Sequence, residues 1–182
     1  MMLEPRRVWQ PVPQPLTSSK SLLVAIMLGD EIKRKKAEAE WVLSLRGDKI
    51  LAAPSYAVID DIGALSASKI MKLRQSKGVD SVLIVSVALG NRGNNLSGLD
   101  LDVYLQQQQN LGFDVFMQQV ESIVADVAIY SLSSNEFVWF GSFELPVKKG
   151  DIDWPKLASS ANSLFYKAGL TPLVPKKETK AE

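Results

Sequence analysis

The chain has 182 residues and a formal net charge of +1, with 46% hydrophobic and 23% charged residues, as expected for one folded domain with a substantial core. This balance of charge argues against long-range electrostatic attraction to nucleic acid. The chain contains no Cys and no His. Disulfides, thiolate metal sites, a Cys nucleophile and a His general base are therefore excluded within it.

Residues 1–19 form a proline-rich leader that is expected to be extended. Its prolines are Pro5, Pro11, Pro13 and Pro15. Two readings are open: a flexible segment, or a strap laid along a partner with Val8 and Trp9 as anchors. The apolar run that follows, Leu22–Leu28, is far shorter than the roughly 20 residues needed to cross a bilayer, so no transmembrane helix is expected.

Leu22–Leu28 is a continuous apolar run that predicts a buried strand closed by Gly29. Asp30 is a candidate N-cap for a helix over 33–45. The expected inner stripe of this helix is Ile32, Ala39, Val42 and Leu45. The basic cluster at 33–36 indicates a solvated helix face, with a site for a phosphate or lipid headgroup as the alternative.

Two further strands and a helix follow. Residues 50–59 predict a strand at the edge of a sheet, because Pro54 cannot donate to a central ladder. A helix after Ser66 is expected to end at Gly78, before a buried strand over Val82–Leu89. The order strand–helix–strand–helix–strand predicts a small parallel sheet with the Pro54 strand outside.

Residues 91–119 interrupt this pattern and are read as an insertion. Apolar and polar residues alternate over 99–105 and again over 113–117, which predicts a hairpin turning at Gly112, with an amphipathic helix over part of the segment as the alternative. No Lys, Arg or Glu occurs from Leu96 to Gln119. Since interfaces favour aromatic over charged residues, we expect either a partner-binding surface or a simple extension of the sheet. The candidate partner-binding residues are Tyr104, Gln106, Gln108, Phe113 and Phe116, together with Trp9 of the leader.

Residues 123–132 and 137–145 predict an antiparallel hairpin, and Asp153 is expected to cap a final amphipathic helix that carries Pro155 in its first turn. The predicted fold is therefore α/β (α+β). A βαβαβ unit, the insertion hairpin, the late hairpin and the C-terminal helix pack on one mixed sheet. Residues 20–172 are expected to form a single domain, followed by a polar tail over 173–182.

Candidate chemistry is sparse. No glycine-rich phosphate loop follows the first strand, and the G-x-x-G of 90–93 is too short to indicate a nucleic-acid module. The acid–base candidates are the strand-end carboxylates Asp30, Glu31, Asp60 and Asp61. Ligands bind at strand ends in open parallel sheets, so a magnesium or acid–base site is one reading and helix N-capping is the other.

Three stretches resemble small bacterial envelope lipoproteins: residues 78–84, residues 128–139 and the end of the last helix at 167–170. This group resembles the N-terminal domain of the Tol-system β-propeller protein, and is similar to penicillin-binding-protein activators and the curli secretion lipoprotein. The resemblance implies a periplasmic, often outer-membrane-associated, non-catalytic subunit that binds other envelope proteins in a multi-subunit assembly. It implies no enzyme activity, cofactor, metal or nucleic acid, and membrane attachment only through a lipid anchor. This sequence contains no Cys to carry a lipid, so an anchor is expected only if that residue has been removed. The alternative is a small α/β enzyme or ligand-binding domain that uses the strand-end carboxylates.

Overall fold

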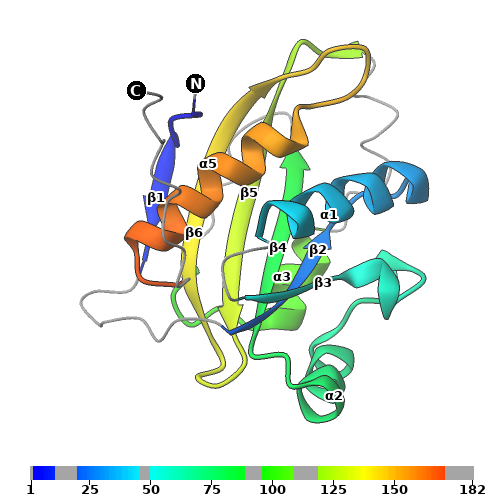
Figure 1. The fold of residues 1–182 in the computed structure, drawn as a ribbon, viewed down its shortest axis with the longest axis vertical. Coiled ribbons are helices and arrows are strands. Elements are labelled where there is room, and N and C mark those ends of the chain that lie inside the picture. Colours follow the sequence, from blue (N-terminus) through cyan, green and yellow to red (C-terminus); the bar gives the residue numbers. More distant parts are fainter. Residues whose placement is uncertain (1, 11–19, 46–49, 89–95, 109–118, 171–182) are drawn as a thin grey trace, which may run out of the picture.

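A six-stranded mixed sheet forms the centre of the molecule, with the strand order β1-β6-β5-β4-β2-β3 (Figure 1). The computed structural model describes residues 2–10, 20–45, 50–88, 96–108 and 119–170. The strands are β1 (Arg7–Trp9), β2 (Ser21–Ile26), β3 (Leu51–Pro54), β4 (Ser81–Ala88), β5 (Ser122–Ser131) and β6 (Glu136–Pro146). Strand β2 pairs in parallel with β3 and β4, whereas the remaining pairs are antiparallel. The predicted mixed α/β sheet is confirmed, with the Pro54 strand at its edge.

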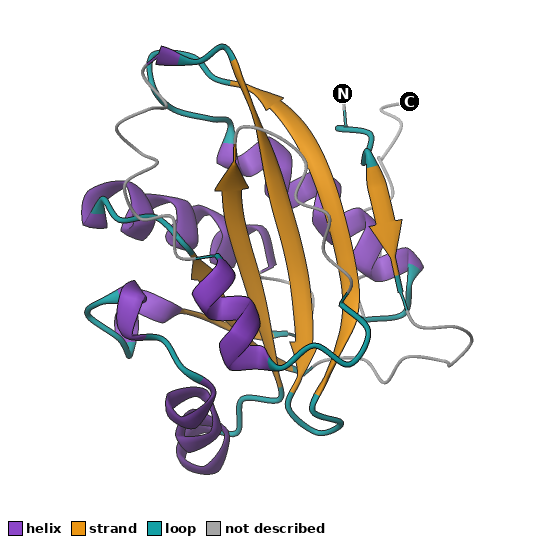
Figure 2. Ribbon diagram, turned by 180° about the vertical axis from the view of Figure 1, so that it is seen from behind, coloured by secondary structure: helices purple, strands orange, loops and turns teal. Residues whose placement is uncertain are grey.

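Helices cover both faces of this sheet. The α-helices are α1 (Glu31–Leu45), α2 (Ala67–Lys77), α3 (Leu101–Gln107) and α5 (Trp154–Lys167), with short 3-10 turns at Ser55–Ala57 and Ile62–Ala64. Helices α1 and α5 lie side by side on one face (Figure 1), whereas α3 lies on the opposite face (Figure 2). Because β2, β4 and β5 are covered on both sides, their side chains are buried almost without interruption.

Each face has its own hydrophobic core. The core under α1 and α5 joins alternate residues of the strands to Trp41, Trp139, Leu157 and Phe165. In β6, Gly141 is required beside one of these residues, because a Cβ there would stand 2.3 Å from a ring carbon of Trp139. The core on the other face is built from the remaining strand residues and from 59–73 and 96–105.

The helix termini follow the signals in the sequence. The Asp30 carboxylate accepts a hydrogen bond from the Lys33 amide at 3.0 Å, and Asp153 accepts one from the Lys156 amide at 3.0 Å. Gly78 ends α2 in the left-handed conformation, with φ of +68°. These local interactions confirm the predicted caps at Asp30 and Asp153 and the predicted stop at Gly78.

Part of the proline-rich leader belongs to the sheet. Strand β1 pairs with β6, where Arg7 lies opposite Ser142 and Trp9 opposite Phe140. Upstream, the Leu3 amide donates to Ser160 Oγ of α5 at 2.8 Å. The reading of a wholly flexible leader is therefore wrong for these residues. The strap lies on its own domain.

The insertion differs from the expected hairpin in its described part. Leu101–Gln107 is a helix, α3, whose first turn is capped by Asp100 through the Val103 amide. The helical alternative holds here, because apolar side chains at helical spacing enter the second core. These are Leu101, Tyr104 and Leu105. Helix α3 is thus part of the core, and the core needs it. The expected turn at Gly112 and the strand over 113–117 lie outside the described residues, as does the tail over 173–182.

Candidate functional site

The carboxyl ends of the parallel strands form a small recess at one end of the sheet. Its volume is about 200 Å³, and its lining includes Glu31, Arg34, Asp60 and Asp61. Asp30 caps α1, and the Asp61 carboxylate accepts from the Gly63 amide at 2.9 Å. The capping alternative is thus realised for both. Within the described ranges, no three Asp or Glu residues gather closely enough to hold a metal ion.

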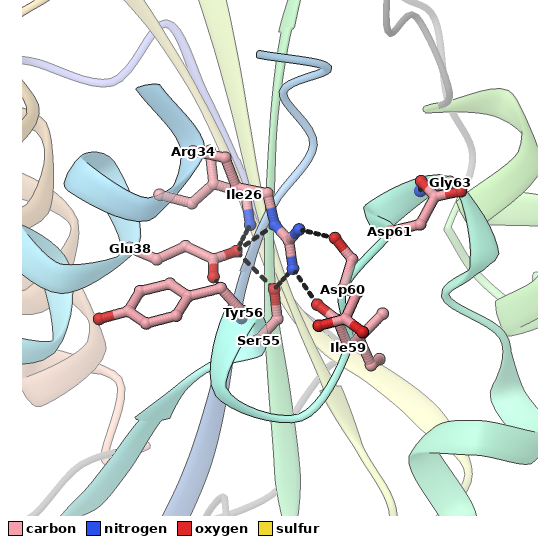
Figure 3. Close-up of polar contacts among 9 residues, drawn as sticks. All are labelled: Ile26, Arg34, Glu38, Ser55, Tyr56, Ile59, Asp60, Asp61 and Gly63. Atoms are coloured by element: carbon pink, nitrogen blue, oxygen red, sulfur yellow. Dashed lines mark hydrogen bonds and ion pairs between the residues drawn. The ribbon is translucent and has the colours of Figure 1, made fainter. Parts of the chain in front are cut away.

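Arg34 is the residue that organises this end of the sheet (Figure 3). Its side chain is 1% exposed although its neighbours in the basic cluster reach solvent. The guanidinium donates to the backbone carbonyls of Ile59 at 2.8 Å and Asp60 at 3.1 Å, and to Ser55 Oγ at 3.0 Å. The prediction of a solvated basic face is therefore wrong for Arg34, which ties α1 to the chain after β3.

Glu38 completes this network from the next turn of α1, where its Oε2 lies 3.5 Å from Arg34 Nε. Oε2 also accepts from the Ile26 amide at 2.9 Å and from Ser55 Oγ at 2.6 Å. Oε1 accepts from the Tyr56 amide at 2.9 Å. Both carboxylate oxygens are thus engaged, and the fully buried side chain is unsuited to accept a proton from an external substrate.

The network therefore acts as an internal clamp between α1, the end of β2 and the chain after β3. Burial raises the pKa of Glu38 above its ordinary value, against the opposing effects of its hydrogen bonds and of Arg34. One signal in the sequence indicates this pair: Arg34 and Glu38 are four residues apart, the spacing of a helical ion pair. That spacing predicts that the two side chains pair, but it does not predict that they are buried.

Glu38→Gln is expected to change how stability depends on pH. Because the folded-state pKa is raised, the contribution of the protonated carboxyl is complete below the unfolded value, near 4.5, and is lost as the pH rises through the folded value. The free energy of unfolding of the wild type, relative to the variant, should fall over that range. Urea unfolding from below pH 4.5 to neutral pH measures it. Parallel pH profiles of the two proteins would contradict the assignment.

The residues predicted to bind a partner are scattered by the fold. Tyr104 is fully buried, and Gln108 is 1% exposed with its Oε1 accepting from Ser86 Oγ at 2.6 Å. The expectation of a solvent-facing aromatic and amide surface is therefore wrong for these two residues, because α3 turns them into the core. Gln106 is exposed and Trp9 half-buried, and their partner role stays a prediction. Phe113 and Phe116 lie outside the described residues.

A different surface carries the most exposed large apolar side chains of the described residues. Ile32 and Leu43 on α1 are 82% and 57% exposed, and Leu51 at the start of β3 is 78% exposed. Ile32 was expected to face inward and does not. All three belong to the elements at the β3 end of the sheet (Figure 1). We refer to these three residues as the α1–β3 surface.

No protein-family model and no curated protein matches the chain by sequence. Solved structures similar to it include the PelC dodecamer from Paraburkholderia phytofirmans, at 13% identity and a TM-score of 0.46, covering 90% of this chain and 97% of that one. The lipoprotein GNA1162 from Neisseria meningitidis is similar at 15% identity and a TM-score of 0.40, covering 81% of this chain and 96% of that one. The resemblance to small envelope lipoproteins and the link to the Tol-system propeller protein both stay predictions.

Proposed function

We propose that the chain is a non-catalytic subunit of a bacterial periplasmic or outer-membrane-associated complex, and that it acts through protein–protein contacts. The observation that carries this proposal is the α1–β3 surface. Three large apolar side chains exposed on adjacent elements favour a surface that a partner covers. The partner is expected to supply apolar side chains to α1 and β3.

The described edge of the sheet supports a binding role. Strand β3 is the last strand of the sheet, so within the described residues no strand pairs with its outer side. Such an edge presents backbone donors and acceptors that another chain can pair with. Only four residues long and ending in Pro54, β3 offers a short edge, which limits pairing with unspecific strands. Leu51 and Leu43 stand beside this edge and would make the contact selective.

The use of the strand-end carboxylates supports a non-catalytic role. Asp30 and Asp61 are engaged as caps, and the Arg34–Glu38 network holds backbone groups of this same chain. The Asp30 and Asp61 carboxylates thus serve local structure, which does not favour the enzyme alternative. In the described part of the chain, no helix is both long and apolar enough to span a bilayer.

The envelope assignment rests on the sequence resemblance. Each stretch that carries it lies in the expected element: 78–84 leads from the end of α2 into β4, 128–139 spans the β5–β6 hairpin, and 167–170 ends α5. In the hairpin turn, Asn135 takes a positive φ of 56°, a conformation that Asn tolerates better than most residues. The resemblance is thus supported by local structure in all three places.

Site-specific photocrosslinking tests the proposed surface. A photoreactive amino acid at Leu43 or Leu51 is expected to give the same protein adduct in intact cells, recovered in the envelope fraction. The variant Leu43→Glu/Leu51→Glu should remain folded, because surface substitutions cost within about 0.5 kcal/mol, and should lose the partner. Mass spectrometry identifies the adduct, and size-exclusion chromatography measures the complex.

The matched control is Val103, an exposed apolar residue on α3 at the opposite face, which is 43% exposed. Val103→Glu should leave the complex intact, and a crosslinker there should give no such adduct. Equal crosslinking from positions 43, 51 and 103, or a normal complex with the double variant, would rule out the α1–β3 surface. An adduct found only in the cytosolic fraction would rule out the envelope assignment.

A further inference from the structure

A second recess lies at the other end of the sheet, away from α1 and β3. Four segments distant in sequence meet there: the end of β1, the loop before α3, the end of β5 and the tip of the β5–β6 hairpin. In Figure 2 the loop before α3 crosses the sheet near this hairpin. Its volume of about 550 Å³ is that of a small-molecule site. Its lining residues are Trp9, Leu96, Ser97, Gly98, Leu99, Asp100, Tyr130, Asn135, Glu136 and Phe137.

Tyr130 supplies a hydroxyl to this recess. The residue is 7% exposed, and its ring packs edge-to-face on Phe137 with centroids 5.0 Å apart. Phe137 packs in turn on Tyr104 at 4.8 Å, which fixes this wall. Its hydroxyl is not among the buried polar atoms without a partner in the described part of the chain, so it is open to the recess. A phenol oxygen in that position can accept a hydrogen bond from a ligand that donates one.

The charge of the recess has one sign. Asp100 and Glu136 line it, and no Lys or Arg among the described residues does. Burial raises the pKa of the Tyr130 hydroxyl, and the negative charges of Asp100 and Glu136 raise it further. The charges of both carboxylates are therefore felt at the Tyr130 hydroxyl. Asp100 is held in place because it also caps α3 through the Val103 amide.

We propose that this recess binds a small primary ammonium group between the carboxylates of Asp100 and Glu136 and the aromatic wall of Tyr130, Phe137 and Trp9. An ammonium group donates three hydrogen bonds, which the two carboxylates and the phenol oxygen accept. Aromatic faces attract such a cation most strongly where water is excluded. Neither an anion nor an apolar ligand would satisfy the carboxylates. The site is separate from the α1–β3 surface, so the two proposals can fail independently.

Isothermal titration calorimetry with the full chain tests this site, with cadaverine as a free amine and N-acetyl-lysine amide as the mimic of a lysine side chain. Saturable binding of either amine is expected, and the tighter probe indicates the source of the cation. Binding should also change the emission of Trp9, since the other tryptophans are at most 2% exposed. Trp9→Phe should remove that change.

The variant Asp100→Asn/Glu136→Gln keeps a capping side chain at position 100 and removes both charges. We expect it to bind about tenfold more weakly or not at all, the size of a lost charge-assisted hydrogen bond. The matched control, Glu121→Gln/Glu144→Gln, removes two exposed charges that do not line the recess and should bind normally. The proposal is overturned if neither amine binds, if pentanediol binds equally well, or if both double variants weaken binding alike. Circular dichroism verifies that the variants are folded.

Discussion

Arg34→Met is expected to lower the free energy of unfolding by about 3–5 kcal/mol, the cost of removing one partner of a buried ion pair. The methionine fills much of the space of the arginine stem, so the loss reports the lost polar contacts rather than a cavity. Without the guanidinium, Glu38 stays buried without its cation, and the carbonyls of Ile59 and Asp60 lose their donor. Urea unfolding monitored by circular dichroism measures the change.

Two comparisons make this result specific. Lys35→Met, at the exposed neighbouring position, should change stability by no more than about 0.5 kcal/mol. The double variant Arg34→Met/Glu38→Gln should be less destabilised than the sum of its two single variants, because each removal strands the other partner. If Arg34→Met costs less than about 1 kcal/mol, or if the two substitutions are additive, the clamp is not a coupled pair.

The strands were the most predictable part of this fold, for a physical reason. Apolar runs of strand length are typical of a sheet covered on both faces, and β2 and β4 are of this kind. The edge position of β3 followed equally directly, because Pro54 lacks the amide that a central ladder needs. The late hairpin lies close to its predicted bounds, and so does α5, which is predicted by the cap at Asp153 and by apolar residues at helical spacing.

The sequence of the insertion is ambiguous because the periodicities of a strand and of a helix both match it. Leu99, Leu101, Val103 and Leu105 alternate as in a strand, whereas Leu101, Tyr104 and Leu105 also match one face of a helix. Asp100 favours the helix by capping its first turn, and the short length of α3 leaves periodicity little power to separate the two patterns. Tyr104 was predicted to be exposed on the hairpin, and this prediction is wrong because the residue lies in a helix that buries it.

The orientation of α1 could not be read from apolar residues alone. Its inward face includes Arg34, Glu38, Trp41 and Leu45, which recur at helical spacing and mix charged with apolar side chains. Ile32 stands two positions before Arg34, about 200° around the helix axis, and is therefore turned to solvent. The buried Arg34 donates to the Ile59 carbonyl, and its partner Glu38 accepts from the Ile26 amide of β2. Both of these backbone groups come from distant sequence.

Phe165→Ala is expected to lower the free energy of unfolding by about 3–5 kcal/mol, as for other buried aromatic residues replaced by alanine. Phe165 is completely buried on α5. Its ring meets Trp139 of β6 edge-to-face, with centroids 4.8 Å apart and planes at 88°. The contact joins the final helix to strand β6, where Trp139 also lies against Gly141. Neighbouring side chains are closely packed, so the cavity cannot collapse fully.

Chemical unfolding followed by tryptophan fluorescence measures this loss, because Trp139 reports the same contact. Tyr166→Ala is the matched control: it removes an aromatic ring one residue further along α5, where the side chain is 37% exposed, and should cost much less. Phe165→Leu should recover part of the stability, since it restores apolar volume without the edge-to-face contact. A loss below about 1 kcal/mol for Phe165→Ala, or equal losses for the variants at 165 and 166, would show that α5 does not anchor this core.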